Sequence, residues 1–375
     1  VGCAPEQTQR FLESYVKPIL EINKNIIRRN AETILVLCRK NGVEPFAVIK
    51  GFNALDGVTE AIVEAGYKTL ASSRLPHLAA VRRSAYDVET LALRIPMLSE
   101  IPEVIEYCDI SLNSELETLK ALDKEARSAD KIHKVILMRD LGDLREGIFE
   151  RERFIETAIS AEKHLPNLRL FGVGTNLTCY GSVIPTVENL SVLAKDAAEI
   201  ERAIGRELEV VSGGNTTSIP LMVSGKMPKK VNNLRIGEAI TVPCDLAGHW
   251  HCPVEGLSNE GLILRAEVIE VGSKPTHPIG ELGVNCFGSY SDYEDRGVRR
   301  RALVALGAFD IGACDKLIPQ DKGVKILGAS SDHMIIDIED SSVNYGLGDV
   351  MSFTLHYQAM LFATANPFIT KKYVN

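Results

Sequence analysis

The sequence lacks several features that would place it in a familiar class. It has no apolar run approaching the roughly 20 residues that a membrane helix needs, so we expect no membrane partner. With 42 Lys and Arg against 50 Asp and Glu, the net charge is −8, which argues against nucleic acid as the main partner. Residues 1–5 show no basic segment followed by an apolar one, so we expect no secretory signal.

Closely spaced cysteine pairs are also missing. The chain of 375 residues has eight scattered cysteines and no C-x-x-C motif: Cys3, Cys38, Cys108, Cys179, Cys244, Cys252, Cys286 and Cys314. This pattern is typical of free thiols in a cytoplasmic protein and not of a disulfide framework. One alternative stays open, because His249, His251 and Cys252 could bind zinc together with Cys244. We predict no metal there, since the surrounding loop is rich in glycine and proline.

Short apolar segments alternate with helical patterns over the first two thirds of the chain. The predicted strands are Phe46–Lys50, Thr69–Ser73, Thr90–Arg94, Asp109–Asn113, Lys134–Asp140, Leu170–Asn176, Leu208–Gly213 and Asn233–Ala239. Eight strands that alternate with helices predict a closed (β/α)8 TIM-type barrel. A doubly wound sheet is the competing interpretation, but no G-x-G-x-x-G follows the first strand, which disfavours its dinucleotide-binding form.

The pattern changes near residue 241. Helical periodicity fades, and short alternating strands such as Leu262–Ile269 and Met334–Ile338 take over, with glycine and proline between them. We therefore predict an α/β chain of two domains. Residues 1–243 form the barrel with an N-terminal arm, and residues 244–375 form a C-terminal all-β domain.

A single lysine follows the first barrel strand, in the segment Phe46-Ala47-Val48-Ile49-Lys50-Gly51. The carboxyl ends of barrel strands carry the catalytic groups of such folds. A partly desolvated lysine there has a lowered pKa and can attack a carbonyl carbon. The alternative for this segment alone is a lysine that extends to solvent from the strand end.

A second signal lies at the last two barrel strands. The turn Ser212–Ser218 is small and rich in hydroxyl groups, and its backbone N–H groups could bind a phosphate. Arg235 and Gly237 follow at the next strand. An ordinary turn with a helix cap explains the segment Ser212–Ser218 equally well by itself. Together with Lys50, however, it is the arrangement expected for pyridoxal 5′-phosphate bound in a barrel.

Several longer motifs carry a family resemblance along nearly the whole chain. They are Ala47–Lys50, Ser111–Glu115, Asp140–Gly147, Gly174–Gly181, Ser212–Asn215, Asn233–Ala239, Phe287–Gly288 with Glu294–Gly297, and Gly328–His333. In this order they resemble the ornithine racemase branch of the alanine racemase family. The resemblance implies a pyridoxal phosphate barrel with a C-terminal β domain, and a head-to-tail homodimer in which each β domain lends residues to the partner's active site.

The resemblance also implies a role for each matching residue. Lys50 becomes the lysine that forms a Schiff base with the cofactor, and Arg145 contacts the cofactor or the substrate carboxylate. The other residues implied to bind the cofactor are Asn176, Asn215, Thr216, Arg235, Gly237, Glu238 and Tyr357. Asp332 would come from the partner subunit, where it could pair with the side-chain ammonium of ornithine or lysine.

The second proton-transferring group departs from the family pattern. Racemisation needs one base on each face of Cα. The tyrosine expected in the β domain falls at Phe287, which cannot transfer a proton. The adjacent Cys286 could act as a thiolate base, although it equally fits a packed small residue, and Asp295, Asp332 and His333 are further candidates.

We therefore predict an amino-acid racemase that depends on pyridoxal phosphate and acts on ornithine or another basic amino acid. It would interconvert the L and D forms through a Schiff base and two-base proton exchange at Cα. The alternatives are a decarboxylase or lyase on the same scaffold and a non-catalytic carrier of the cofactor.

Overall fold

The computed structural model describes residues 18–374, so Cys3 and the N-terminal residues discussed above lie outside it. Its contacts divide the chain into two compact units. One runs from Ile27 to Leu257, and the other joins the described residues up to Ile26 with Ser258 onward. The predicted domain limits, 1–243 and 244–375, stay a prediction.

The first unit is a closed barrel of eight parallel strands, in the order of the chain. They are Glu44–Val48 (β2), Thr69–Ser72 (β3), Glu89–Ala92 (β4), Ile110–Asn113 (β5), His133–Met138 (β6), Leu168–Gly174 (β7), Val210–Ser212 (β8) and Asn233–Ile236 (β9). All eight predicted strands exist and the predicted fold class is confirmed. The ladder closes where β2 pairs with β9.

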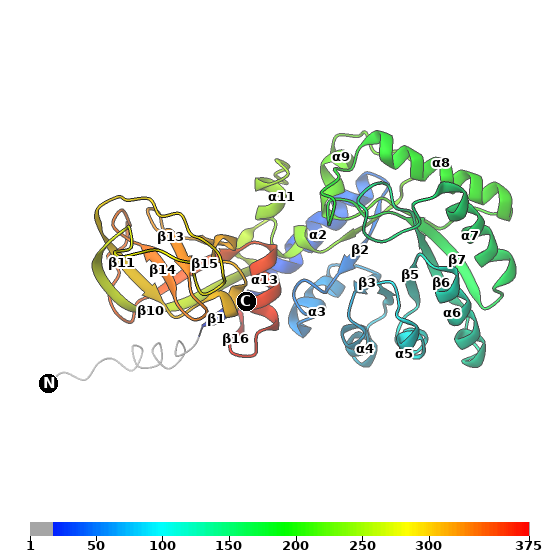
Figure 1. Cartoon of the computed structure of the whole chain (residues 1–375). Coiled ribbons are helices and arrows are strands. Elements are labelled where there is room, and N and C mark those ends of the chain that lie inside the picture. The colour runs from blue at the N-terminus through cyan, green and yellow to red at the C-terminus, as the bar shows by residue number, and fades with distance from the viewer. Residues whose placement is uncertain (1–17, 375) are drawn as a thin grey trace. The chain divides into compact units, whose positions relative to one another are not determined.

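Helices connect the barrel strands, and Figure 1 shows α3 to α8 around them. The helices are Lys24–Lys40 (α2), Asp56–Glu64 (α3), Leu75–Arg83 (α4), Ile101–Tyr107 (α5), Leu116–Ser128 (α6), Arg151–His164 (α7), Val187–Ile204 (α8), Ile219–Val223 (α9), Glu238–Thr241 (α10) and Cys244–Gly248 (α11). Local sequence sets their ends. Thr186 and Asn189 form a capping box at the start of α8, and Gly205 ends it at φ +77°.

Two apolar layers hold the barrel together. One combines strand residues such as Val135 and Leu137 with helix residues such as Leu119 and Phe154. The other contains only strand residues, including Phe46 and Ile136. Because successive strand side chains point to opposite faces, these sets are the outer and inner faces of one sheet. The strand runs are therefore apolar without alternation, as the sequence shows.

The second unit is an antiparallel sheet with the strand order β12-β15-β10-β11-β14-β13. Its strands are Ile19–Asn23 (β1), Leu262–Pro275 (β10), Val298–Val304 (β11), Leu317–Pro319 (β12), Lys325–Ala329 (β13), Met334–Asp337 (β14), Val350–Leu355 (β15) and Thr370–Val374 (β16). Two helices, Ala308–Ile311 (α12) and Tyr357–Ala365 (α13), accompany it. The N-terminal strand β1 pairs with β10 and β16, so the chain's first described strand belongs to this unit.

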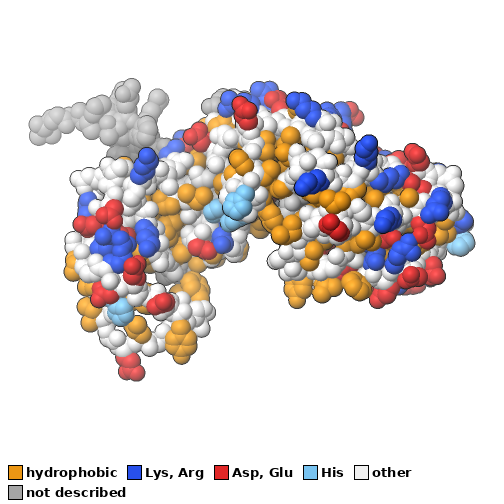
Figure 2. All heavy atoms as spheres, turned by 90° about the horizontal axis from the view of Figure 1, so that it is seen from above, with side chains coloured by type: hydrophobic (Ala, Val, Ile, Leu, Met, Phe, Trp, Pro, Cys, Tyr) orange, Lys and Arg blue, Asp and Glu red, His pale blue; other side chains and the backbone are white. Residues whose placement is uncertain are grey.

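Short 3-10 turns complete the fold at Leu98–Glu100, Thr216–Ser218, Asn259–Gly261 and Cys314–Lys316. Acidic and basic side chains are interspersed on the face that Figure 2 shows. Exposed pairs such as Lys68 with Asp87 and Lys120 with Glu117 stabilise the fold little. Among the described helices, none combines the length and the apolar character required to span a bilayer.

Candidate active site

Lys50 lies in the turn that follows the first barrel strand. The strand β2 ends at Val48, two residues earlier than the predicted end. Ile49 still donates its N–H to the carbonyl of Ala71 at 2.9 Å, which ties the start of the turn to the neighbouring strand. The side chain of Lys50 is half-buried at the carboxyl end of the barrel.

The charges around Lys50 tune its amine. Burial lowers the pKa of Lys50 most, and the positive charge of Arg145 lowers it further. Cys179 and Glu146 act in the opposite direction on this pKa, and Arg235 again lowers it. The net effect favours the neutral amine, which is the nucleophilic form.

Arg235 is the centre of a buried hydrogen-bond network that joins four strands. It is 4% exposed, and it donates to Ser212 Oγ at 2.5 Å and to the carbonyl of Thr175 at 2.7 Å. Ser212 in turn donates to Asn233 Oδ1 at 2.5 Å, and Asn233 donates to the carbonyl of Glu44 at 2.7 Å. Burial lowers the pKa of Arg235 to about 10, so it stays charged at neutral pH.

The hydroxyl-rich turn after β8 is fixed by Asn215. Asn215 Oδ1 accepts the N–H of Thr217 at 2.9 Å, and its amide donates to the carbonyl of Leu177 at 2.9 Å and to Asn176 Oδ1 at 3.3 Å. This single side chain therefore links the predicted phosphate turn to the loop after β7. Thr216 begins the 3-10 turn and is buried.

Two hydroxyl groups at these strand ends are buried without a hydrogen-bond partner, on Thr217 and on Thr175. Nearby, Thr216 Oγ1 accepts the N–H of Ala239 at 3.4 Å. A Cβ at Gly237 would lie 2.6 Å from the carbonyl oxygen of Val48. Only glycine fits there. Because β9 ends at Ile236 and α10 begins at Glu238, the predicted strand end at Ala239 is wrong.

Arg145 and its neighbour Glu146 occupy the loop after β6. Arg145 Nη2 donates to Glu146 Oε1 at 2.6 Å, and Arg145 Nε also donates to the same carboxylate. Although burial lowers the pKa of Arg145, the hydrogen bond and charge of Glu146 raise it overall. The buried Arg139 holds this loop, since its Nη1 donates to the carbonyls of Asp140 at 2.9 Å and Ile148 at 2.7 Å.

Asp143 joins this loop to the loop after β7. Its carboxylate is 1% exposed and accepts the N–H groups of Tyr180 at 3.0 Å and of Cys179 and Val183 at 3.3 Å. A Cβ at Gly181 would lie 2.6 Å from the Asp143 carbonyl oxygen, so the close approach requires glycine. The side-chain amide of Asn176 donates a hydrogen bond to Cys179 Sγ at 2.9 Å.

The remaining predicted site residues lie in the β unit. Cys286 is exposed in the segment between β10 and β11, next to Phe287, which is 55% exposed. Asp332 is exposed and accepts a hydrogen bond from Ser331 Oγ at 2.5 Å. Tyr357 begins α13 and is half-buried. Their roles in the site stay predictions.

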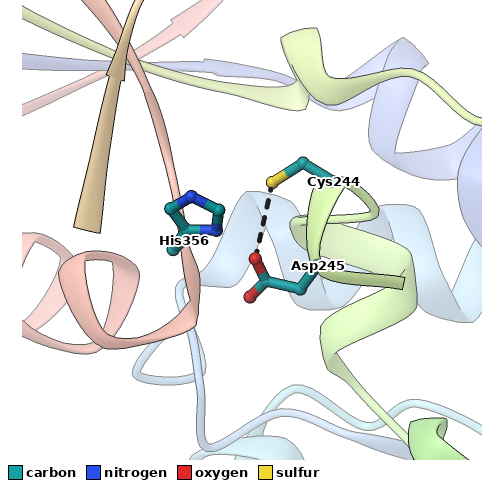
Figure 3. A group of neighbouring side chains, drawn as sticks. All are labelled: Cys244, Asp245 and His356. Carbon is teal, nitrogen blue, oxygen red and sulfur yellow. Dashed lines mark hydrogen bonds between the residues drawn. The ribbon is translucent and has the colours of Figure 1, made fainter. Parts of the chain in front are cut away.

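The predicted alternative of a zinc site falls in the barrel unit after α10. Cys244 Sγ donates to Asp245 Oδ1 at 3.7 Å, the bond drawn in Figure 3, and His249 Nε2 lies 3.8 Å from the same oxygen. Burial and the charge of Asp245 raise the pKa of Cys244 to about 12. Cys244 is therefore a protonated donor in this arrangement, and the absence of a metal stays a prediction.

Comparison with known proteins adds the family. The model of the alanine racemase N-terminal domain matches residues 22–243. The chain belongs to the alanine racemase family. It is 41% identical to the ornithine racemase of Acetoanaerobium sticklandii over 96% of this chain and 99% of that one. It is 36% identical to the lysine racemase of Thermotoga maritima over the same shares of the two chains.

Solved structures share the fold at low identity. The alanine racemase of Streptomyces coelicolor A3(2) superposes with a TM-score of 0.71 at 18% identity, over 97% of this chain and 99% of that chain. The D-threonine aldolase of Filomicrobium marinum reaches 0.70 at 14% identity, over 92% and 88%. The solved structures show the fold alone, whereas the family model and the two sequence relatives confirm the predicted family and the enzyme class, an amino-acid racemase.

The structure brings together Lys50, Arg145 and Arg235, whose charges act on one another. Glu146 and Cys179 also act on the pKa of Lys50, and the sequence analysis gave neither of them a role. Glu146 lies in the motif Asp140–Gly147, one residue after Arg145. Cys179 lies in the motif Gly174–Gly181, three residues after Asn176. Their proximity to Lys50 depends on loops from different strands, which spacing alone does not reveal.

Proposed function

We propose that the protein is a pyridoxal 5′-phosphate-dependent racemase that interconverts the L and D forms of ornithine or another basic amino acid. The names of the two sequence relatives, an ornithine racemase and a lysine racemase, support this substrate class. The observation that carries the proposal is the half-buried amine of Lys50, whose pKa is lowered beside Arg145 and Arg235.

The residues present fit such a cofactor. The unpartnered buried hydroxyl of Thr217 lies in the turn proposed to hold the phosphate, together with Thr216. Gly237 keeps the backbone free of a side chain at the next strand end, where Glu238 begins a short helix. Backbone N–H groups at such turns bind phosphate oxygens well.

The proposed roles of the other side chains follow from their chemistry. Arg235 remains charged at neutral pH and cannot take a proton from a ring nitrogen, which restrains side reactions. Asn176 and Asn215 hold the loop after β7 and the turn after β8 together, and Arg145 would bind a carboxylate or a phenolic oxygen. Tyr357 is proposed to reach the phosphate.

When bound, the cofactor supplies the electron sink that makes the Cα–H bond of an amino acid acidic. Lys50 then has two tasks. Its neutral amine would hold the cofactor, and the same amine would take or return a proton on one face of Cα. For the opposite face of Cα, Cys286 is the candidate base from the sequence analysis.

We further propose a homodimer in which Asp332 of one subunit completes the site of the other and binds the side-chain ammonium of the substrate. The exposed position of Asp332 supports this role. The seven cysteines in the described residues are free, which supports a reducing compartment, the cytoplasm. Sedimentation equilibrium tests the proposed homodimer, and a monomer at assay concentration would contradict it.

A lyase is the second candidate, because the D-threonine aldolase of Filomicrobium marinum shares the fold. That likeness concerns the fold alone, whereas the racemases match at 41% and 36% identity. A carrier is disfavoured because it would need only the barrel and its lysine.

The test is a panel of L- and D-amino acids incubated with the protein and pyridoxal phosphate, followed by polarimetry. We expect the rotation of ornithine or lysine to decay to zero, and Lys50→Ala to remove the decay. Lys120→Ala, on the exposed face of α6, is the matched control and keeps it. Unchanged rotation for every amino acid would contradict the proposal, and release of an aldehyde or of carbon dioxide would favour the lyase.

A further inference from the structure

The second proton-transferring group has a candidate in the barrel itself. Lys50 serves one face of Cα, and Phe287 replaces the tyrosine expected for the other. We propose that Cys179, in the loop after β7, is the catalytic residue that exchanges the proton on the opposite face. This inference rests on the proposed racemase function.

The position of Cys179 is fixed by hydrogen bonds to both its backbone and its sulfur. The Asp143 carboxylate accepts the Cys179 N–H at 3.3 Å and 3.4 Å from its two oxygens. The Asn176 amide donates to Cys179 Sγ at 2.9 Å, and the Asn215 amide lies 3.9 Å from the same sulfur. A base must be held in place to act on one face of a substrate, and these contacts hold the sulfur beside the predicted cofactor residues.

The surroundings of Cys179 are rich in positive charge. The charge of Cys179 acts on Lys50, on Arg145 and on Arg235, so all three cations lie within electrostatic range of the sulfur.

Two acids also lie in this region, and both have partners. The Glu146 carboxylate pairs with Arg145, and that of Asp143 is surrounded by backbone N–H donors. Cys179 nevertheless remains exposed at the end of the barrel, where a substrate can reach its sulfur.

Cys286, the group that the sequence proposes, has a different environment. It is also exposed, but within residues 18–374 no hydrogen bond involves its sulfur. Its neighbours Asn285 and Phe287 bond to each other through the backbone N–H of Phe287 at 2.9 Å. Cys179 is therefore held in a defined place in the single chain, and Cys286 is not.

The step balances in protons and needs no oxidant. For one enantiomer the Cα–H bond breaks as the S–H bond of Cys179 forms, and an N–H bond of the Lys50 ammonium breaks as the new Cα–H bond forms on the other face. For the opposite enantiomer the two groups exchange roles. After each turnover the pair is in the protonation state that the opposite enantiomer requires.

The test follows deuterium from D2O into Cα, starting separately from each enantiomer of ornithine with added cofactor. Wild-type protein incorporates deuterium from both. In Cys179→Ala we expect racemisation from both enantiomers to fall by about 10²–10⁴-fold, the usual contribution of a general base, and deuterium exchange from one of the two enantiomers to fall with it. Exchange from the other enantiomer persists, because Lys50 still serves that face.

Controls separate this inference from other outcomes. Cys314→Ala, in the β unit and outside the proposed site, keeps exchange from both enantiomers. The absorbance of bound cofactor in Cys179→Ala shows an intact site, and Cys179→Ser provides a second variant with a hydroxyl that is a poor base. Two-sided exchange in Cys179→Ala, or one-sided loss in Cys286→Ala alone, would overturn the inference. Wild-type protein that exchanges neither enantiomer would contradict the proposed function itself.

Discussion

The barrel and the β unit each contain part of the proposed site, and the two parts differ in how they are held. In the barrel, Arg235, Ser212 and Asn215 form hydrogen bonds across strands and loops that are distant in sequence. In the β unit, Asp332 is exposed and bonds to its immediate neighbour, Ser331. The barrel half is therefore organised by contacts between distant strands and loops, whereas the described hydrogen bond of Asp332 is local.

Each unit also contains one buried carboxylate between two arginines. Asp196, 1% exposed, lies 3.4 Å from Arg139 and 2.8 Å from Arg151 in the barrel. Asp337, also 1% exposed, lies 2.5 Å from Arg299 in the β unit, and Arg296 pairs with it at 3.3 Å. The barrel carboxylate supports the loop of Arg145 through Arg139, whereas the other fastens β14 to β11.

The largest predicted effect on stability concerns these carboxylates. We expect Asp337→Ala to lower the free energy of unfolding by about 1.5–3 kcal/mol, because half-buried Arg296 and Arg299 lose their buried partner and keep only the exposed Asp340. Although burial raises the pKa of Asp337, the hydrogen bond from Arg299 lowers it overall, below 3.8. Its stabilisation is therefore present above pH 3.8 and is lost as pH falls through the lowered value.

Denaturant titration at pH 7 and near pH 3 measures this difference. The gap between wild type and Asp337→Ala should narrow in acid. Asp340→Ala, whose carboxylate is 63% exposed, is the control and should change stability little. A gap that does not change with pH would contradict the assigned ion pair.

Glu238 in the barrel should show the opposite pH trend. Burial, followed by the charge of Asp245, raises the pKa of Glu238 from 4.5 to about 7. The unfolded chain ionises first, so folding loses stability as pH rises from 4.5 to 7. Glu238→Gln should therefore stabilise the cofactor-free protein at pH 8 by up to about 3 kcal/mol, and have little effect at pH 4. Thermal melts at both pH values test this, with exposed Glu255→Gln as the control.

The smallest predicted effect concerns the unit that recognises the side-chain ammonium of the substrate. We expect Asp332→Asn to lower kcat/KM for ornithine by about 10- to 100-fold, the contribution of one charged hydrogen bond. The kcat/KM for norvaline, which lacks the side-chain ammonium, should stay unchanged. Glu146→Gln should weaken both substrates alike, because Glu146 holds Arg145. If Glu146→Gln selectively weakened ornithine, recognition would belong to the barrel instead.

The sequence predicted the features of this site that depend on short segments. Lys50 follows an uninterrupted apolar run, and Asn215 and Arg235 lie in motifs long enough to identify. It did not predict the pairing of β1 with β10, whose residues are more than 200 positions apart. Nor did it find Asp143 as the support of Cys179, because backbone N–H donors 36 and 37 residues away leave no pattern in side-chain types.

The central claim is that Lys50 is the cofactor lysine of a centre built by the barrel. The direct measurement is incubation of the protein with pyridoxal phosphate, reduction with borohydride, and peptide mapping by mass spectrometry. We expect one pyridoxyl group per chain, on Lys50. A label on a different lysine, or one spread over surface lysines with Lys50 unmodified, would contradict it.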